Sequence, residues 1–183
     1  MSDTITVNGD TFVLYLSEEQ IRKRVQDLGR QLNLDYSGSV PIFIGVLNGS
    51  FIFFADLIRE VTIDCEMDFI KLSSYGDAKI SSGDVRVLKD LNCQVENRDI
   101  VIVEDIVDSG LSIDFLKRLI ISQNPRSVKV VTLLYKKESV QYPVIMDYVG
   151  FEIPNLFVIG YGLDYAQKVR NLRHIYMLEQ HSV

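Results

Sequence analysis

The sequence is poor in the residues that build disulfide frameworks and zinc sites. It contains only two cysteines and two histidines among 183 residues. Cys65 and Cys93 stand apart with no CxxC pair, so we interpret them as buried thiols rather than as a disulfide or a metal site. His174 and His181 are too few and too close to the C-terminus to suggest a zinc site.

Long apolar runs and an excess of basic residues are also absent. No apolar run approaches the roughly 20 residues of a membrane helix, and Met1–Asp10 lacks the basic-then-apolar order of a signal peptide. The formal net charge is −6, so a nucleic-acid duplex would on average repel the chain. We therefore expect a soluble, cytoplasmic protein that binds neither membrane nor nucleic acid.

Apolar strands alternate with amphipathic helices along the chain. Ser17 and Gln20 form a capping-box pattern, after which apolar residues follow at helical spacing. Strands are expected at 11–16, 40–47, 65–73, 85–88, 100–103, 128–134, 156–161 and 175–178, and helices after Ser17, at 51–60 and around 113–120. Val149–Pro154 is expected to be irregular. This order predicts an α/β fold in which helices flank a mostly parallel central sheet, within one domain spanning residues 1–183.

The most informative stretch runs from Ile100 to Ser112. Four β-branched apolar residues, Ile100–Val103, predict a buried strand, and the carboxylates Glu104 and Asp105 follow it. Asp108-Ser109-Gly110-Leu111-Ser112 then leads into a helix, and helix N-termini at such positions bind anions. Three carboxylates within five residues repel one another, so a cation or a hydroxyl-rich ligand would explain them.

Two other loops each allow two interpretations. Asn48-Gly49 is either a turn that needs a positive φ or a loop whose backbone N–H groups meet an anion. The polar segment 74–83 is either a solvated hairpin connection or a mobile flap over a site. Because parallel strands bring their C-terminal loops together, the anion-binding interpretation of Asn48-Gly49 gains support from the Ile100–Ser112 stretch.

Three other phosphate-binding α/β classes fit the sequence less well. The P-loop string GxxxxGK[ST] does not occur. A Rossmann fold needs GxGxxG after its first strand, but the single GxG, Gly160-Tyr161-Gly162, lies near the C-terminus without a third glycine. An aspartyl-phosphate enzyme stays open, but nothing in the sequence supports it.

The Ile100–Ser112 pattern resembles the phosphoribosyl pyrophosphate motif of the type I phosphoribosyltransferases. The segments V-L-N-G-S-F-I-F, L-S-S-Y-G, L-L-Y-K-K and Y-V-G-F-E-I-P-N-L-F-V-I-G-Y-G-L-D-Y narrow this resemblance to the hypoxanthine (hypoxanthine-guanine) phosphoribosyltransferases. The resemblance implies transfer of a phosphoribosyl group from phosphoribosyl pyrophosphate to hypoxanthine or guanine, giving IMP or GMP and pyrophosphate. It also implies a core at about 38–148, a hood from about 1–37 and 149–183, and a homodimer or homotetramer.

The resemblance assigns roles to matching residues. Asp108 matches the general base and is also among the phosphoribosyl pyrophosphate-binding matches. Ser109, Gly110, Leu111 and Ser112 match the loop that holds the 5′-phosphate. Glu104 and Asp105 match ribose-binding residues near a bound Mg²⁺, and Asp164 matches a Mg²⁺ ligand on the pyrophosphate side. The remaining phosphoribosyl pyrophosphate-binding matches are Asn48, Gly49, Ser74, Tyr75 and Arg170, and the purine-binding matches are Lys136, Phe157, Val158 and Asp164.

Each role has an ordinary structural alternative. Lys136 could be a solvated lysine at a strand end, Phe157 a core residue, and Asp164 a turn cap. Asn48 departs from the family, since many relatives carry a lysine there, after a cis peptide. A cationic side-chain contact from this loop, to ligand or to a neighbouring subunit, is therefore in doubt.

Two other functions compete with purine salvage. A phosphoribosyltransferase-like regulator that binds nucleic acid would need a basic face, which the net charge of −6 opposes. A transferase for adenine or a pyrimidine is disfavoured by Lys136, because adenine presents a donor where a 6-oxopurine presents an acceptor.

Overall fold

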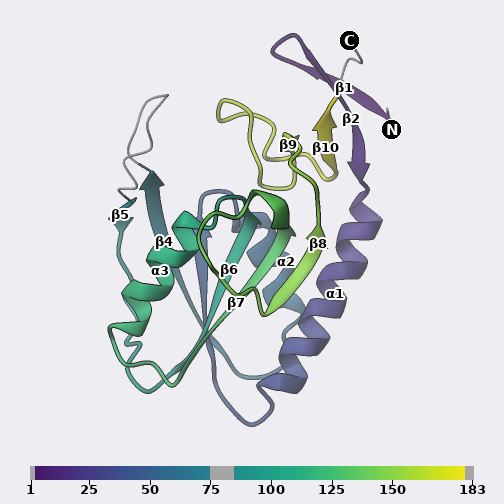
Figure 1. The fold of residues 1–183 in the computed structure, drawn as a ribbon. Helices are drawn as coiled ribbons and strands as arrows, with labels where there is room; N and C mark the ends of the chain where they lie inside the picture. The colour runs from purple at the N-terminus through teal and green to yellow at the C-terminus, as the bar shows by residue number, and fades with distance from the viewer. Residues whose placement is uncertain (1–2, 75–84, 180–183) are drawn as a thin grey trace.

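A six-stranded, mostly parallel sheet forms the centre of the molecule (Figure 1). The computed structural model describes residues 3–74 and 85–179. The strand order is β5 (Val85–Lys89), β4 (Glu66–Ser74), β3 (Ile42–Leu47), β6 (Asp99–Val107), β7 (Ser127–Tyr135) and β8 (Tyr148–Glu152). Adjacent strands are parallel, except that β5 runs antiparallel to β4. The predicted mostly parallel α/β fold is confirmed.

Helices cover both faces of this sheet because successive strand residues point in opposite directions. Val101 and Val103 of β6 belong to the core under α1 (Glu18–Asp35) and α2 (Phe51–Glu60). Ile100 and Ile102 face the core under α3 (Leu111–Ile121). All four side chains are fully buried, as expected for a strand that is covered on both sides.

The first helix begins as its sequence predicts. The Ser17 hydroxyl accepts a hydrogen bond from the Gln20 N–H at 3.3 Å, and the Gln20 side chain accepts one from the Ser17 N–H at 2.9 Å. The residues at helical spacing that were expected to form its packing face are buried: Ile21, Val25, Leu28 and Leu32.

The two ends of the chain pair in a second, four-stranded antiparallel sheet. Its order is β1 (Thr4–Val7), β2 (Asp10–Leu16), β10 (Ile175–Leu178) and β9 (Val158–Ile159). Figure 1 shows this sheet at the end of the molecule toward which the parallel strands run. The carboxyl ends of those strands therefore face it.

Several elements differ from the sequence prediction. β6 continues through the carboxylates Glu104 and Asp105 to Val107 instead of ending at Val103. Residues 148–152 are the edge strand β8 rather than an irregular segment, paired in parallel with β7. The strand expected at 156–161 is limited to Val158–Ile159. β1 was not predicted, and η1 (Lys137–Ser139) is a single 3₁₀ turn.

The two cysteines and the helices agree with the sequence analysis. Cys65 and Cys93 are free and partly buried, and burial raises the pKa of the Cys93 thiol to about 11. Among residues 3–74 and 85–179, no helix has the length and apolar composition needed to cross a membrane.

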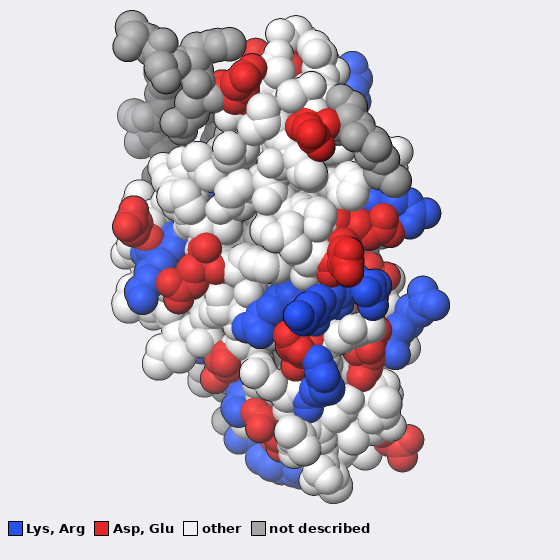
Figure 2. All heavy atoms as spheres, turned by 90° about the vertical axis from the view of Figure 1, so that its right-hand side faces the viewer, with Lys and Arg blue, Asp and Glu red and all other residues white. Residues whose placement is uncertain are grey.

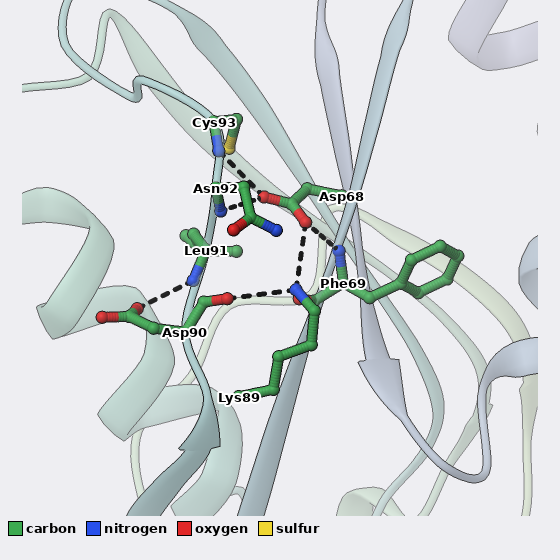
Figure 3. A network of polar contacts seen from close by, with 7 residues as sticks. All are labelled: Asp68, Phe69, Lys89, Asp90, Leu91, Asn92 and Cys93. Atoms are coloured by element: carbon green, nitrogen blue, oxygen red, sulfur yellow. Dashed lines mark hydrogen bonds and ion pairs between the residues drawn. The ribbon is translucent and has the colours of Figure 1, made fainter.

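Asp68 is the centre of a polar network at the base of the β4–β5 hairpin (Figure 3). Its carboxylate accepts hydrogen bonds from the N–H groups of Phe69, Asn92 and Cys93 at 2.6–2.9 Å, and the Lys89 ammonium lies 3.3 Å away. Burial alone would raise the pKa of Asp68, but these donors outweigh burial and hold it well below its usual range. The charged carboxylate therefore fastens the segment after β5 to β4.

We expect Asp68→Asn to lower the free energy of unfolding by about 1–3 kcal/mol at pH 7, because an amide cannot accept all four donors. A lowered folded pKa stabilises the fold above the ordinary value of 3.8 and loses its effect as the pH falls through the folded pKa. The difference from wild type should thus hold from pH 7 to pH 5 and shrink below about pH 4. Urea unfolding measures it, with Asp90→Asn as the control because the carboxylate of exposed Asp90 accepts, among the described residues, only the N–H of Leu91. Equal losses in both variants would contradict the expectation.

Candidate active site

A cavity of about 480 Å³ opens where β3, β6 and β7 end, facing the small sheet. It brings together most of the residues predicted from the sequence, although they span the chain from Gly49 to Arg170. The predicted residues that line it are Gly49, Glu104, Asp105, Asp108, Ser109, Gly110, Leu111, Ser112, Lys136, Phe157, Val158, Asp164 and Arg170.

Three predicted residues stand apart from this set. Asn48 is exposed and does not line the cavity, although its neighbours Leu47 and Gly49 do. The Leu47–Asn48 peptide is cis, as the resemblance implied. Ser74 is the last residue of β4, and Tyr75 lies outside the described residues, so the two interpretations of segment 74–83 stay open.

Glu104 and Asp105 form a buried pair of carboxyl groups at the floor of the site. Each residue is only 7% exposed, and their side chains hydrogen-bond to each other. Burial, and then the neighbouring Asp105, raise the pKa of Glu104 well above its usual range. Burial likewise raises the pKa of Asp105, although the Arg170 guanidinium opposes that shift. Two such groups are poised for a cation or for hydroxyl donors.

Gly49 is needed for close packing, not for its φ angle. Its φ is not among the positive values, so the interpretation as a positive-φ turn is wrong. A Cβ at Gly49 would lie 1.9 Å from the Asp105 Oδ2 atom. On its other side, a Cβ at Gly162 would lie 2.1 Å from the Gly49 carbonyl oxygen. The Asn48-Gly49 loop is therefore wedged between the carboxyl pair and the segment that leads to Asp164.

The loop at 108–112 has the form of an anion cradle. Gly110 adopts φ +86 and precedes the first residue of α3, whose first N–H groups lack partners within the helix. The Ser109 carbonyl accepts hydrogen bonds from the N–H groups of Gln141 and Tyr142 at 2.9 and 3.2 Å, which holds the loop in place. Backbone N–H groups and the positive end of the helix dipole thus favour a phosphate here.

Lys136 and Asp108 form an ion pair at the edge of the cavity. The Lys136 Nζ atom lies 2.7 Å from Asp108 Oδ2 and 3.4 Å from the amide oxygen of Asn155. The side chain of Lys136 is 9% exposed, whereas that of Asp108 is 54% exposed. The ordinary interpretation of Lys136 as a solvated lysine is therefore wrong. A buried cation beside an accessible carboxylate can bind a group that both accepts and donates hydrogen bonds.

Phe157 is not a core residue, although it lies beside an apolar strand. It lines the cavity and is 46% exposed. Its ring lies 5.4 Å from Tyr165, edge on, and 6.0 Å from fully buried Phe12. Two aromatic neighbours thus support a ring that remains available to stack on a flat ligand.

Asp164 and Arg170 belong to one compact segment between β9 and β10. The Arg170 guanidinium contacts Asp164 Oδ1 at 2.7 Å and donates to the Gly162 carbonyl at 2.8 Å. Asp164 Oδ2 accepts the Gln167 N–H at 2.8 Å, so Asp164 also caps a turn, as its structural alternative proposed. Both side chains are mostly buried and line the cavity.

Comparison with known proteins identifies this arrangement. The model of the phosphoribosyl transferase domain matches residues 15–166. The chain belongs to the phosphoribosyltransferase family.

Named relatives of this phosphoribosyltransferase match it over most of both chains. It is 48% identical to the hypoxanthine-guanine phosphoribosyltransferase of Bacillus subtilis (strain 168) over 164 residues, which are 90% of this chain and 91% of that protein. It is 45% identical over 177 residues to the hypoxanthine-guanine phosphoribosyltransferase of Mycobacterium tuberculosis (strain H37Rv), covering 93% of this chain and 88% of that one.

Solved structures agree with these sequence matches. A hypoxanthine phosphoribosyltransferase from Staphylococcus aureus has a TM-score of 0.87 at 38% identity and covers 91% of this chain and 90% of its own. A hypoxanthine-guanine phosphoribosyltransferase from Bacillus anthracis has a TM-score of 0.86 at 42% identity, covering 90% and 96%. The resemblance inferred from the sequence is confirmed.

The carboxyl groups in the cavity of this phosphoribosyltransferase are too few to surround a metal ion, so the substrate would have to supply the remaining ligands of the ion. Within the described ranges, no group of three or more His, Cys, Asp or Glu residues is arranged to hold a metal ion. Glu104 and Asp105 nevertheless form a buried pair of carboxyl groups, whose oxygens can bind a cation and whose charge Arg170 offsets only in part. Mg²⁺ prefers oxygen ligands and usually binds through one or two carboxylates together with substrate phosphates and water, so the pair fits this ion.

Sequence reasoning missed the apolar walls of the cavity. These residues lie near strand ends, in loops or, for one of them, in the first turn of α3, and nothing in their type distinguishes them from core: Val46, Leu47, Leu72, Ile106, Val107, Ile113, Leu156 and Leu163. It also missed Asn155, whose contact with Lys136 joins residues 19 positions apart. A polar residue among apolar ones at 153–159 is the only signal that could have identified it.

Proposed function

We propose that this phosphoribosyltransferase transfers the 5-phosphoribosyl group of phosphoribosyl pyrophosphate to hypoxanthine and to guanine, with IMP or GMP and pyrophosphate as products. The observation that supports a 6-oxopurine as the acceptor is the 2.7 Å pair between buried Lys136 and accessible Asp108. This pair lies in one cavity with the phosphate cradle and Phe157. A 6-oxopurine presents an oxygen acceptor and a ring N–H on neighbouring positions, which match a cation and a carboxylate.

The phosphoribosyl half of the site serves the donor substrate. Residues 109–112 hold the 5′-phosphate through backbone N–H groups and the Ser109 and Ser112 hydroxyls. Glu104 and Asp105 accept hydrogen bonds from the ribose hydroxyls, and the wedged position of Gly49 aims the backbone of its loop at pyrophosphate. Arg170 neutralises part of the pyrophosphate charge.

The purine half of the site positions the acceptor. Phe157 stacks on the ring, Lys136 donates to the 6-oxygen, and Val158 addresses the ring edge through its backbone. Asp108 accepts the proton from N7 as N9 attacks C1 of the ribose and the bond from C1 to pyrophosphate breaks. Lys136 is paired with Asp108 and has a further N–H for the 6-oxygen, so the carboxylate lies beside the purine that it deprotonates.

Bound Mg²⁺, held by Glu104, Asp105 and Asp164 together with substrate oxygens, would neutralise the charge that develops on the leaving pyrophosphate. Asp164 already uses both oxygens within its own segment, so this residue keeps Arg170 oriented whether or not it contacts the ion. The bond to pyrophosphate breaks with oxocarbenium character at C1, so the enclosed geometry must also exclude water.

Other features of the protein follow from the same proposal. Ser74 and Tyr75, the second of which lies outside the described residues, are further proposed to bind phosphoribosyl pyrophosphate. The backbone of Asn48 contributes to pyrophosphate binding without a lysine side chain. Residues 38–148 act as the core and residues 1–37 and 149–183 as the hood. We further propose a cytoplasmic homodimer or homotetramer.

A panel of bases tests the proposed reaction. Hypoxanthine, guanine, xanthine and adenine are each mixed with phosphoribosyl pyrophosphate, Mg²⁺ and enzyme, and nucleotide formation is followed by absorbance. We expect product with hypoxanthine and guanine and at most trace product with adenine. A protein that makes AMP faster than IMP, or that makes no nucleotide at all, does not have this function.

Phe157→Ala should separate purine binding from folding. Removal of the stacking ring is expected to raise the KM for hypoxanthine about 10-fold, since aromatic pairs contribute about 0.5–1.5 kcal/mol beyond buried area. Because Phe157 is nearly half exposed, the melting temperature should fall by only a few degrees. Steady-state kinetics and calorimetry measure both, and Phe157→Tyr, which keeps the ring, is the control. A large loss of stability with an unchanged KM would show that Phe157 packs in the core and does not stack on the purine.

A further inference from the structure

Asn155 is the one uncharged side chain that reaches the Lys136 ammonium in the described part of the chain. Its amide oxygen lies 3.4 Å from Lys136 Nζ, the same atom that pairs with Asp108 at 2.7 Å. An ammonium carries three donors. Asp108 and Asn155 take two of them, and the third is available to a ligand in the cavity that Lys136 lines.

The backbone around Asn155 is tied to the strand that carries Lys136. The Ile153 N–H donates to the carbonyl of Tyr135, the residue before Lys136, at 2.9 Å. The Leu156 N–H donates to the Pro154 carbonyl at 2.8 Å and tightens the turn that presents Asn155. Phe157 follows two residues later, so one short segment supplies both the stacking ring and the contact to Lys136.

Lys136 has two partners, Asp108 and Asn155. The charge of Asp108 changes during the proposed reaction, whereas Asn155 stays neutral throughout. When Asp108 takes the purine proton it becomes neutral, and its attraction for Lys136 falls sharply. The ammonium is then buried and needs acceptors that do not depend on protonation. An amide oxygen is such an acceptor, whereas a second carboxylate would compete with the 6-oxygen for the cation.

We propose that Asn155 is a positioning residue for Lys136, which directs the ammonium to the 6-oxygen of the purine and thereby sets the preference for 6-oxopurines. The proposal rests on the proposed function of the site. Asn155 contributes through one long hydrogen bond, at 3.4 Å, from the ammonium to a neutral oxygen, so its effect is moderate and is confined to ligands that carry the 6-oxygen.

Equilibrium binding of two nucleotides distinguishes a loss of the contact to the 6-oxygen from a general disruption of the site. Calorimetric titration gives the Kd of IMP and that of purine riboside 5′-monophosphate, which lacks the 6-oxygen, for wild type and for Asn155→Ala. We expect Asn155→Ala to weaken the binding of IMP about 3–10-fold, the range of one hydrogen bond of ordinary net strength, and to leave the binding of the analogue within 2-fold of wild type. Glu152→Ala, an exposed change at the end of β8, should leave both Kd values unchanged.

The outcomes distinguish a failure of the role of Asn155 from a failure of the proposed function. Equal weakening of both nucleotides, or of neither, overturns the role of Asn155. If wild type itself binds IMP no better than the analogue, the Lys136 contact in the proposed function fails instead. Should Asn155→Ala not fold, Asn155→Ser, which keeps a shorter neutral acceptor, gives the same comparison. KM values should agree, with hypoxanthine affected and phosphoribosyl pyrophosphate unaffected.

Discussion

Replacement of Asp108 by Asn is expected to lower kcat with hypoxanthine by about 10²–10⁴-fold, the usual contribution of a general base. The amide keeps the shape of the side chain and an oxygen for Lys136, but it cannot take the N7 proton. The KM for phosphoribosyl pyrophosphate should change little, because the 5′-phosphate cradle begins at Ser109. Steady-state kinetics with each substrate varied in turn measure these constants.

The stability of Asp108→Asn should stay close to that of wild type. Asp108 is more than half exposed, so solvent screens its attraction for Lys136 and the loss of the pair costs little. Asp114→Asn is a control on α3, because it removes a partly exposed carboxylate whose ion pair, within the described residues, is the one with Arg118 at 2.8 Å. A variant of Asp108 that folds and retains a kcat within 2-fold of wild type would exclude the general-base role.

Replacement of Glu104 by Gln is expected to stabilise the ligand-free protein while it impairs the reaction. Glu104 and Asp105 are buried together, so burial and the neighbouring Asp105 raise the pKa of Glu104. The amide of Gln is neutral without taking up a proton on folding, and it can still donate to Asp105. A gain of about 1–3 kcal/mol in unfolding free energy is expected at pH 7.5. The kcat/KM for phosphoribosyl pyrophosphate should fall at least 10-fold, because a carboxylate for ribose and Mg²⁺ is lost.

The pH dependence of stability has a defined sign for this pair. A carboxyl group whose pKa is raised in the folded state keeps its proton at pH values where the unfolded chain has released it. The stability of the ligand-free wild type should therefore decrease as the pH rises above the ordinary glutamate value of about 4.5. Glu104→Gln should show a smaller decrease between pH 5 and pH 8.

Thermal unfolding with and without Mg²⁺ and phosphoribosyl pyrophosphate tests both halves of this expectation. Ligands should raise the melting temperature of wild type more than that of Glu104→Gln, since binding to the folded state stabilises it by mass action. Glu138→Gln, at an exposed position in η1, is the control and should match wild type. A destabilised Glu104→Gln with normal kinetics would show that the charge of Glu104 serves folding alone.

Local patterns in the sequence predicted most of the fold. The α1 cap and packing stripe, the apolar strand at Ile100–Val103 and the helix after Gly110 depend on neighbours within a few residues. They could therefore be read without knowledge of distant contacts. β8 could not, because Gly150 breaks its apolar pattern. That glycine is required by the pairing itself, since a Cβ there would lie 2.3 Å from the Leu133 carbonyl oxygen of β7.

The order of residues in the Ile100–Ser112 motif, together with Lys136, Phe157 and Asp164, was enough to indicate the family and its chemistry. The tertiary structure decided how those residues are placed. β6 extends through Glu104 and Asp105 because β7 pairs with it as far as Val107, so the two carboxylates are buried within a strand. Register between β6 and β7 also sets Lys136 against Asp108, 28 residues earlier. Such contacts depend on strand pairing across long sequence separations, which no local pattern encodes.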